Sequence, residues 1–162
     1  MPSAPPTRDG FCHTRQVTQP ASTPHLIVDR VAMLRRAGLF ATTPGRVLAG
    51  LASRLEEVSF SAGERLIAAG AIEGWLLVLV EGEVEVVRPD GRVRVGPVET
   101  IGELSVLDPG PRIADVVAVT DGWALRLAKE DFDEALRLRP EIAVGIITAL
   151  ARRLREMRER ND

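Results

Sequence analysis

One short segment of the chain combines residue types that suit the binding of a phosphorylated sugar. Residues 101–114 read Ile-Gly-Glu-Leu-Ser-Val-Leu-Asp-Pro-Gly-Pro-Arg-Ile-Ala. Gly102 leads into an expected short helical turn, whose first backbone amides present partial positive charge to an anion. Arg112 follows a Gly-Pro turn, and its planar guanidinium matches a phosphate better than a lysine does. Glu103 would repel a bare phosphate, so we expect its carboxylate to accept hydrogen bonds from sugar hydroxyls. The alternative is a weak surface ion pair between Arg112 and Glu103.

The stretch around this segment is typical of an antiparallel roll or barrel. Between residues 58 and 127, short β-rich runs alternate with glycine turns about every eight to ten residues. The run at 75–80 is almost continuously apolar, as in a strand buried on both faces. Pro89-Asp90-Gly91 predicts a tight turn between two further strands. We expect the last two runs to pair with each other. The predicted strands cover residues 75–80, 84–87, 93–95, 114–119 and 123–127.

Helices are predicted on both sides of the roll. Apolar spacing indicates one over residues 26–39, and a second in which Thr43 is the N-cap and Pro44 the first residue. After the roll, residues 131–138 and a segment from Glu141 nearly to the end are predicted to be helical. The fold class is therefore α+β: an antiparallel β-roll, resembling a double-stranded jelly roll, flanked by N-terminal helices and two C-terminal helices.

Length and composition favour one domain and exclude several functions. The Pro-, Ser- and Thr-rich residues 1–25 are predicted to be a flexible leader, and residues 26–162 one domain with its roll at about 58–128 and its C-terminal helices at about 130–160. A net charge of −2 argues against non-specific nucleic-acid binding. The single cysteine, Cys12, cannot form an internal disulfide, so a cytoplasmic location is expected. No apolar run is long enough to span a membrane.

The sequence does not indicate an enzyme. Both histidines, His13 and His25, precede the body of the chain, so the roll lacks the imidazoles that a cupin-type metal site requires. No serine, cysteine or lysine lies beside a plausible base for covalent catalysis. We therefore expect neither catalysis nor a metal or other cofactor.

The residues of segment 101–114 are similar to a known binding motif. Gly102-Glu103-Leu104, a short spacer, and Pro111-Arg112 followed by Ala114 resemble the phosphate-binding cassette of cyclic-nucleotide-binding domains. That family includes the bacterial catabolite activator proteins and the regulatory subunits of cyclic-AMP-dependent kinase. The resemblance extends over about residues 28–158 and implies a regulatory β-roll that binds a cyclic nucleotide.

The resemblance also implies a role for each residue of the motif. Arg112 would pair with the exocyclic oxygens of the cyclic phosphate, and Glu103 would accept a hydrogen bond from the ribose 2′-hydroxyl. Gly102, Leu104 and Ser105 would contribute backbone amides or allow the ligand to come close.

The last predicted helix has two possible uses. Its apolar residues fall at steps of three and four, the spacing of a seam between packed helices. Such a seam would join two copies in a homodimer, or it would cover the chain's own roll. The resemblance places Met157 and Arg158 about where the family's purine-capping residues lie. Because no DNA-reading segment follows, regulation would need an effector protein or a larger parent polypeptide. The apolar residues are Ala143, Ile147, Leu150, Leu154 and Met157.

Three residues depart from the family pattern or bear on the affinity. Ile113 stands where the family often has Ser, Thr or Ala, and without a hydroxyl it favours cyclic AMP over cyclic GMP. Val98 stands where the turn before the cassette usually has glycine. Strand alternation places Asp115 outside the site. The second hypothesis is therefore a degenerate fold, in which Ile113 marks a pocket that has lost its ligand and the chain serves only protein interaction or dimerisation.

Overall fold

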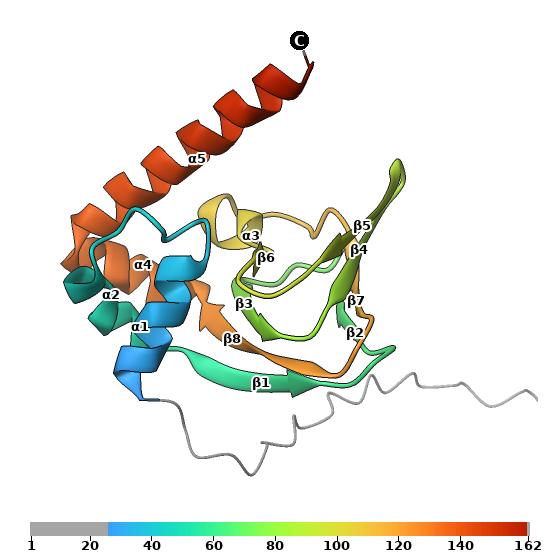
Figure 1. Cartoon of the computed structure of the whole chain (residues 1–162), viewed down its shortest axis with the longest axis horizontal. Helices are drawn as coiled ribbons and strands as arrows, with labels where there is room; N and C mark the ends of the chain where they lie inside the picture. The colour runs from blue at the N-terminus through green and yellow to red at the C-terminus, as the bar shows by residue number, and fades with distance from the viewer. Residues whose placement is uncertain (1–25, 162) are drawn as a thin grey trace, which may run out of the picture.

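A computed structural model of the chain describes residues 26–161, so the leader predicted for residues 1–25 lies outside the described part. Two helices precede the strands, a short helix interrupts them, and two helices follow (Figure 1). The helices are α1 (Ile27–Arg36), α2 (Gly45–Ala52), α3 (Leu104–Leu107), α4 (Lys129–Leu138) and α5 (Pro140–Asn161). The strands are β1 (Glu56–Phe60), β2 (Arg65–Ile67), β3 (Trp75–Glu81), β4 (Val84–Arg88), β5 (Gly91–Val95), β6 (Thr100–Ile101), β7 (Asp115–Ala118) and β8 (Gly122–Ala128).

The strands form two four-stranded antiparallel sheets, in the orders β1-β8-β3-β6 and β2-β7-β4-β5. This arrangement confirms the predicted β-roll with helices on both sides. The predicted hairpin of β4 and β5 is present, with Arg88 opposite Gly91. One predicted pairing was wrong, because β7 and β8 lie in different sheets. The chain crosses from one sheet to the other at Gly122, where an added Cβ would collide with the carbonyl oxygen of Glu81.

Strand β3 separates two parts of the core. Leu76 and Val78 are buried against the helices, whereas Leu77 and Leu79 are buried inside the roll. The strand is therefore buried on both faces, as its continuous apolar run predicted. Because side chains alternate along a strand, Trp75 lies on the same face as Leu77, the face toward the roll interior.

The ends of the helices differ from the predictions in detail. Helix α1 stops at Arg36 instead of residue 39, and α4 begins at Lys129, two residues earlier than predicted. Thr43 was wrongly predicted as the N-cap of α2, since Pro44 takes that position. The Thr43 side chain is buried, its hydroxyl has no hydrogen-bond partner in the described chain, and it packs directly against Gly145 of α5.

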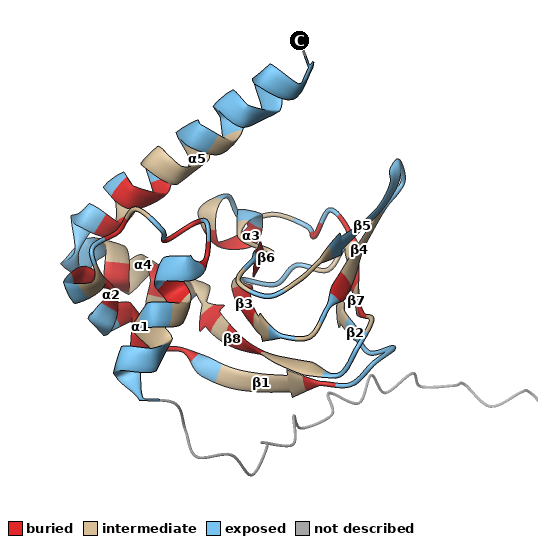
Figure 2. Cartoon of the chain, in the orientation of Figure 1, coloured by how far each residue is buried: buried red, intermediate tan, exposed pale blue. Residues whose placement is uncertain are grey.

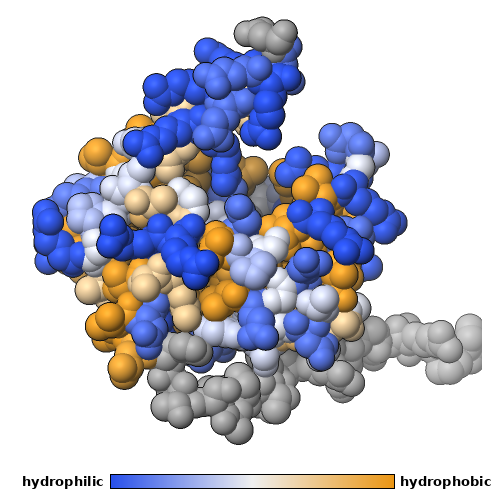
Figure 3. Space-filling model, in the orientation of Figure 1, coloured by the Kyte–Doolittle hydropathy of each residue, from blue (hydrophilic) through white to orange (hydrophobic). Residues whose placement is uncertain are grey.

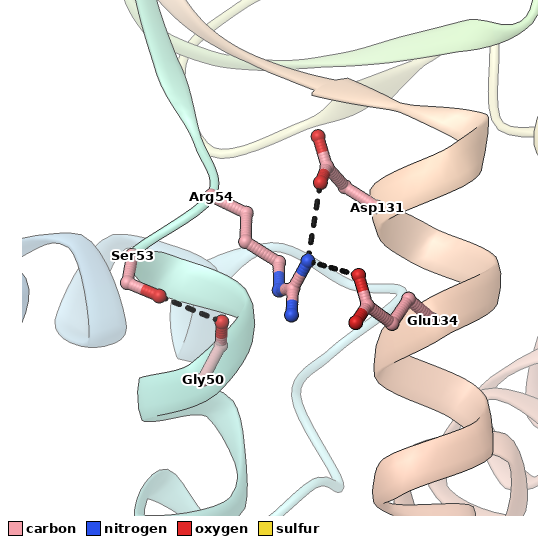
Figure 4. A network of polar contacts seen from close by, with 5 residues as sticks. All are labelled: Gly50, Ser53, Arg54, Asp131 and Glu134. Carbon is pink, nitrogen blue, oxygen red and sulfur yellow. Dashed lines mark hydrogen bonds and ion pairs between the residues drawn. The ribbon is translucent and has the colours of Figure 1, made fainter.

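A polar network fastens the end of α2 to α4 (Figure 4). Nη1 of Arg54, just after α2, lies 3.2 Å from Oδ1 of Asp131 and 2.6 Å from Oε2 of Glu134. The hydrogen bond from Arg54 lowers the pKa of Glu134. These contacts hold α4 in place, and α5 follows α4 directly after Arg139.

The fully buried residues of helix α5 lie in its first turns. Ile142, Gly145 and Ile146 are buried, whereas the helix beyond Leu150 extends away from the roll and is largely exposed (Figures 1 and 2). Ile147, Leu154 and Met157 of the predicted seam are exposed, whereas Leu150 packs against the core, so the stripe covers the chain's own body only in part. None of the helices between residues 26 and 161 is both long and apolar enough to cross a membrane.

Candidate functional site

A cavity of about 370 Å³ opens beside the segment that contains α3. Its walls come from β6, α3 and the loop that leads to β7, with further residues from β4 and β5. Cavities of this size are within the range that small-molecule sites occupy. Among its lining residues are all six members of the predicted binding set: Gly102, Glu103, Leu104, Ser105, Arg112 and Ile113.

Arg112 is the charged group on the cavity wall that is most deeply buried, with 5% of its surface exposed. Its Nη1 donates to Oγ of Ser105 at 2.9 Å and to the carbonyl oxygen of Gly102 at 3.2 Å. Its Nη2 donates to the carbonyl oxygen of Trp75 at 2.8 Å. Its Nε is buried without a hydrogen-bond partner. Three acceptors thus fix the guanidinium, and one buried donor remains unsatisfied.

The close packing of Arg112 explains why residue 102 is a glycine. Gly102 has a φ of +77°, and a Cβ on it would lie 2.5 Å from Nη1 of Arg112. A side chain at this position would therefore be strained and would also displace the arginine. The first helical bond of α3 runs from the Ser105 amide to the Gly102 carbonyl, so the Glu103 and Leu104 amides precede it.

The charge of Arg112 is only partly compensated by its surroundings. Burial is the main cause that lowers the pKa of Arg112, Glu73 opposes this shift, and Arg126 adds to it. Oε2 of Glu73 lies 3.8 Å from Nε of Arg112, beyond hydrogen-bonding distance. The arginine nevertheless keeps its positive charge at neutral pH. The cavity wall therefore presents a buried cation that forms a long ion pair with Glu73, without a hydrogen bond between the two side chains.

Glu103 also lines the cavity, but its carboxylate already has a partner. Oε1 of Glu103 accepts a hydrogen bond from Nη1 of Arg153 in α5 at 2.9 Å. Glu103 and Arg112 thus share one cavity and do not form the surface ion pair with each other that was the alternative. The contact with Arg153 connects the cavity wall to the last helix.

Three residues were singled out because they depart from the family pattern or bear on the affinity for the nucleotide, and they differ in their position relative to the cavity. Ile113 lines the cavity with 64% of its surface exposed, and so it does not plug the cavity. Asp115 is absent from the cavity walls, and its Oδ1 accepts a hydrogen bond from the Ala69 amide at 2.8 Å. Val98 has a φ of +67°, a left-handed conformation that is strained for a β-branched residue.

A second hollow of about 770 Å³ lies between the β4–β5 hairpin and α5. Figure 3 shows the hydrophilic end of α5 and the hydrophilic hairpin on either side of an open notch. Arg88, Val95 and Thr100 line both hollows, so the two adjoin. Met157 lines only the second hollow, and Arg158 lines neither. In this arrangement neither residue contributes to the wall of the smaller cavity.

Two residues near Arg112 were missed by the sequence analysis. Trp75, the first residue of β3, contacts the arginine from 37 residues earlier in the chain, and Glu73 contacts it from the loop just before β3. The local sequence gives no sign of this contact, because only the folding of the roll brings the two segments together. Among residues 26–161, no group of three or more His, Cys, Asp or Glu is placed to hold a metal ion.

Comparison with known proteins gives consistent matches. The family model described as the cyclic nucleotide-binding domain matches residues 57–139. A CRP-like cAMP-activated global transcriptional regulator of Mycobacterium tuberculosis is 34% identical over 129 residues, which cover 76% of this chain and 58% of that protein. The chain thus spans little more than half the length of that relative.

Solved structures match over most of the chain. The N-terminal domain of a transcriptional regulator from Streptomyces coelicolor is 39% identical, with a TM-score of 0.68, and covers 80% of this chain and 95% of that one. The catabolite activator protein of Thermus thermophilus is 32% identical, with a TM-score of 0.65, over 78% of this chain and 62% of that one. The resemblance that the cassette residues carried is therefore confirmed.

Proposed function

This chain belongs to the cyclic nucleotide-binding domain family, and from that membership and the geometry of its cavity we propose that it is a sensor module for a cyclic nucleotide. The observation that carries the proposal is the buried guanidinium of Arg112 on the cavity wall, which donates hydrogen bonds to Gly102, Ser105 and Trp75 and none to a carboxylate of the described chain. A buried cation without a hydrogen-bonded carboxylate is costly, and a phosphate in the cavity would pair with it through charge-assisted hydrogen bonds. In this proposal Arg112 binds the exocyclic oxygens of the cyclic phosphate.

The remaining cavity residues support a nucleotide over a simple anion. Glu103 is a poor neighbour for a bare phosphate, but its carboxylate can accept a hydrogen bond from a ribose 2′-hydroxyl. Gly102, Leu104 and Ser105 line the cavity beside it, where they would supply amides or allow close approach of the ligand. Ile113 offers an apolar surface and no hydroxyl, which supports cyclic AMP over cyclic GMP.

The output of the sensor would pass through α5. Binding at Glu103 would alter the carboxylate that Arg153 holds, and so change the position or order of the helix. Closure of α5 toward the cavity would bring Met157 and Arg158 to the purine as a cap. The protein would act as a regulatory module in the cytoplasm without catalysis, through an effector protein or a larger parent polypeptide.

Titration of the purified protein with cyclic AMP and cyclic GMP tests the proposal. We expect saturable binding with cyclic AMP preferred, and a loss of at least about a hundredfold in affinity for Arg112→Ala, since two charge-assisted hydrogen bonds disappear. Arg92→Ala is the matched control, because Arg92 is exposed in the hairpin, pairs with Glu85 and does not line the cavity. Absence of binding by the wild-type protein would favour the degenerate fold that serves only protein interaction.

Dimerisation through α5 is the second element of the proposal. Ile147, Leu154 and Met157 expose apolar surface at intervals that suit a seam with the same helix of a second copy. Leu154→Glu should shift the protein toward the monomer in sedimentation velocity. Leu138→Glu is the control, because Leu138 is an exposed leucine at the end of α4, outside the seam. A monomeric wild-type protein at all concentrations would contradict the proposed dimer.

A further inference from the structure

The ring of Trp75 lies against the arginine of the cavity. The guanidinium carbon of Arg112 lies 4.4 Å from the centre of the Trp75 ring, within the range of a cation–π contact. From this contact we infer that Trp75 is a positioning residue, which holds the guanidinium of Arg112 in place for the phosphate of the ligand. This inference rests on the proposed nucleotide binding and assigns a role to a residue outside the cassette.

Trp75 holds Arg112 in two ways at once. Its carbonyl oxygen accepts from Nη2 of Arg112 at 2.8 Å, and its ring lies over the guanidinium carbon. The residue begins β3 and is paired with Ala128 of β8, which restricts its backbone. Trp75 packs against the hydrophobic core inside the roll, which restricts the ring as well. The arginine is therefore oriented by a rigid element.

The electrostatics of the site explain why a ring suits this position. A carboxylate in contact with Arg112 would neutralise the guanidinium and compete with the phosphate of the ligand. An aromatic face attracts the cation through its quadrupole but carries no net charge, so the full charge remains for the ligand. Glu73, the carboxylate near Nε, is 3.8 Å away and 42% exposed, which makes it a weak competitor.

A second arginine contacts the same ring. The guanidinium carbon of Arg126, on β8, lies 5.3 Å from the ring centre, and Arg126 also pairs with Glu56 at 3.6 Å. Arg126 lies opposite Leu77, on the strand that pairs with β3. The aromatic face thus lies close to two cations that repel each other. Without it, Arg112 would lose an attraction and keep the repulsion from Arg126.

The test keeps the ring in one variant and removes it in another. Trp75→Phe preserves an aromatic face, whereas Trp75→Leu preserves apolar volume without one. We expect the affinity for cyclic AMP to fall about tenfold in Trp75→Leu and to be mostly restored in Trp75→Phe, because a desolvated cation–π contact is of this size. Thermal unfolding of both variants shows whether the fold is kept.

The fluorescence of Trp75 provides a second test that does not require the Trp75→Leu variant. Trp123→Phe leaves Trp75 as the single indole of the chain. In that variant, titration with cyclic AMP should change the fluorescence of Trp75 with the same saturation curve as binding. This measurement decides the matter where Trp75→Leu fails to fold.

The outcomes separate the inference from the proposed function. Wild-type affinity in a folded Trp75→Leu, or unchanged Trp75 fluorescence at saturation, overturns the positioning role and leaves nucleotide binding intact. A wild-type protein that binds neither cyclic nucleotide overturns the proposed function and, with it, this inference.

Discussion

Arg153 of α5 donates a hydrogen bond from Nη1 to Oε1 of Glu103 at 2.9 Å, and this contact joins the last helix to the wall of the cavity. Glu103 is the residue immediately before α3, and its carboxylate is largely shielded from solvent. A ligand hydroxyl that donated a hydrogen bond to this carboxylate would share it with Arg153 of α5. The two residues therefore form a direct polar link between the proposed ligand site and the proposed output helix.

The first prediction concerns this link. Arg153→Ala should weaken the binding of cyclic AMP about three- to fivefold, because Glu103 loses a partner that is itself partly exposed. The change in hydrogen exchange of α5 on ligand binding should also shrink. Arg152→Ala, next to it in the same helix and exposed, is the control and should leave both measurements unchanged. Equal effects of the two substitutions would contradict a specific role for Arg153.

The second prediction concerns the glycine of the cassette. Gly102→Ala should lower the free energy of unfolding by about 1–3 kcal/mol, because an alanine is strained at a φ of +77° and its Cβ collides with Arg112. It should also weaken cyclic AMP binding at least about tenfold, since the arginine must move. Gly110→Ala is the matched control in the same loop, because a Cβ there meets nothing within 4 Å. Urea unfolding measures the change in stability, and calorimetric titration measures the change in affinity. Wild-type stability and affinity in Gly102→Ala would contradict the prediction and show that Arg112 can move aside without loss of binding.

The third prediction concerns a stabilising change. Val98 adopts a φ of +67°, which only glycine adopts without cost. Val98→Gly should therefore raise the free energy of unfolding by about 1 kcal/mol, partly offset by the greater entropy of the unfolded chain. Val93→Gly, in the exposed part of β5, should instead destabilise the protein. Urea denaturation of the two variants distinguishes strain relief from a general effect of glycine.

The sequence predicts the local elements and the binding segment better than the sheet pairing. Alternation and glycine turns identify β3, the β4–β5 hairpin and the roll, because these signals are short-range. The pairing of β7 with β2 and β4 was not predicted, since neighbouring strands in sequence usually pair. Here the corner at Gly122 sends the chain into the other sheet instead. The contacts that decide this are long-range and leave no local pattern.

The candidate site was likewise predicted in its local motif but not in its long-range contacts. Gly102, Glu103 and Arg112 were predicted to share one site, and they line one cavity. The contacts that hold two of them, from Trp75 to Arg112 and from Arg153 to Glu103, join segments 37 and 50 residues apart. No motif in the sequence specifies such pairs, because each partner is supplied by a different element of the folded chain.

The last prediction concerns Ile113, the departure that bears most directly on ligand choice. Ile113→Ser introduces a hydroxyl at a cavity-lining position that is largely exposed, so the fold should lose little stability. The hydroxyl can donate to the phosphate or, in cyclic GMP, to the guanine, and one such hydrogen bond contributes about 0.5–1.5 kcal/mol. We therefore expect cyclic AMP to bind up to about tenfold more tightly, with a larger gain for cyclic GMP and a reduced preference between them. Competition titration with both nucleotides measures the ratio of the two affinities. Ile72→Ser is the control for the loss of surface apolar area, because Ile72 is also exposed but does not line the cavity. An unchanged ratio in Ile113→Ser would contradict the role assigned to Ile113 in selecting cyclic AMP.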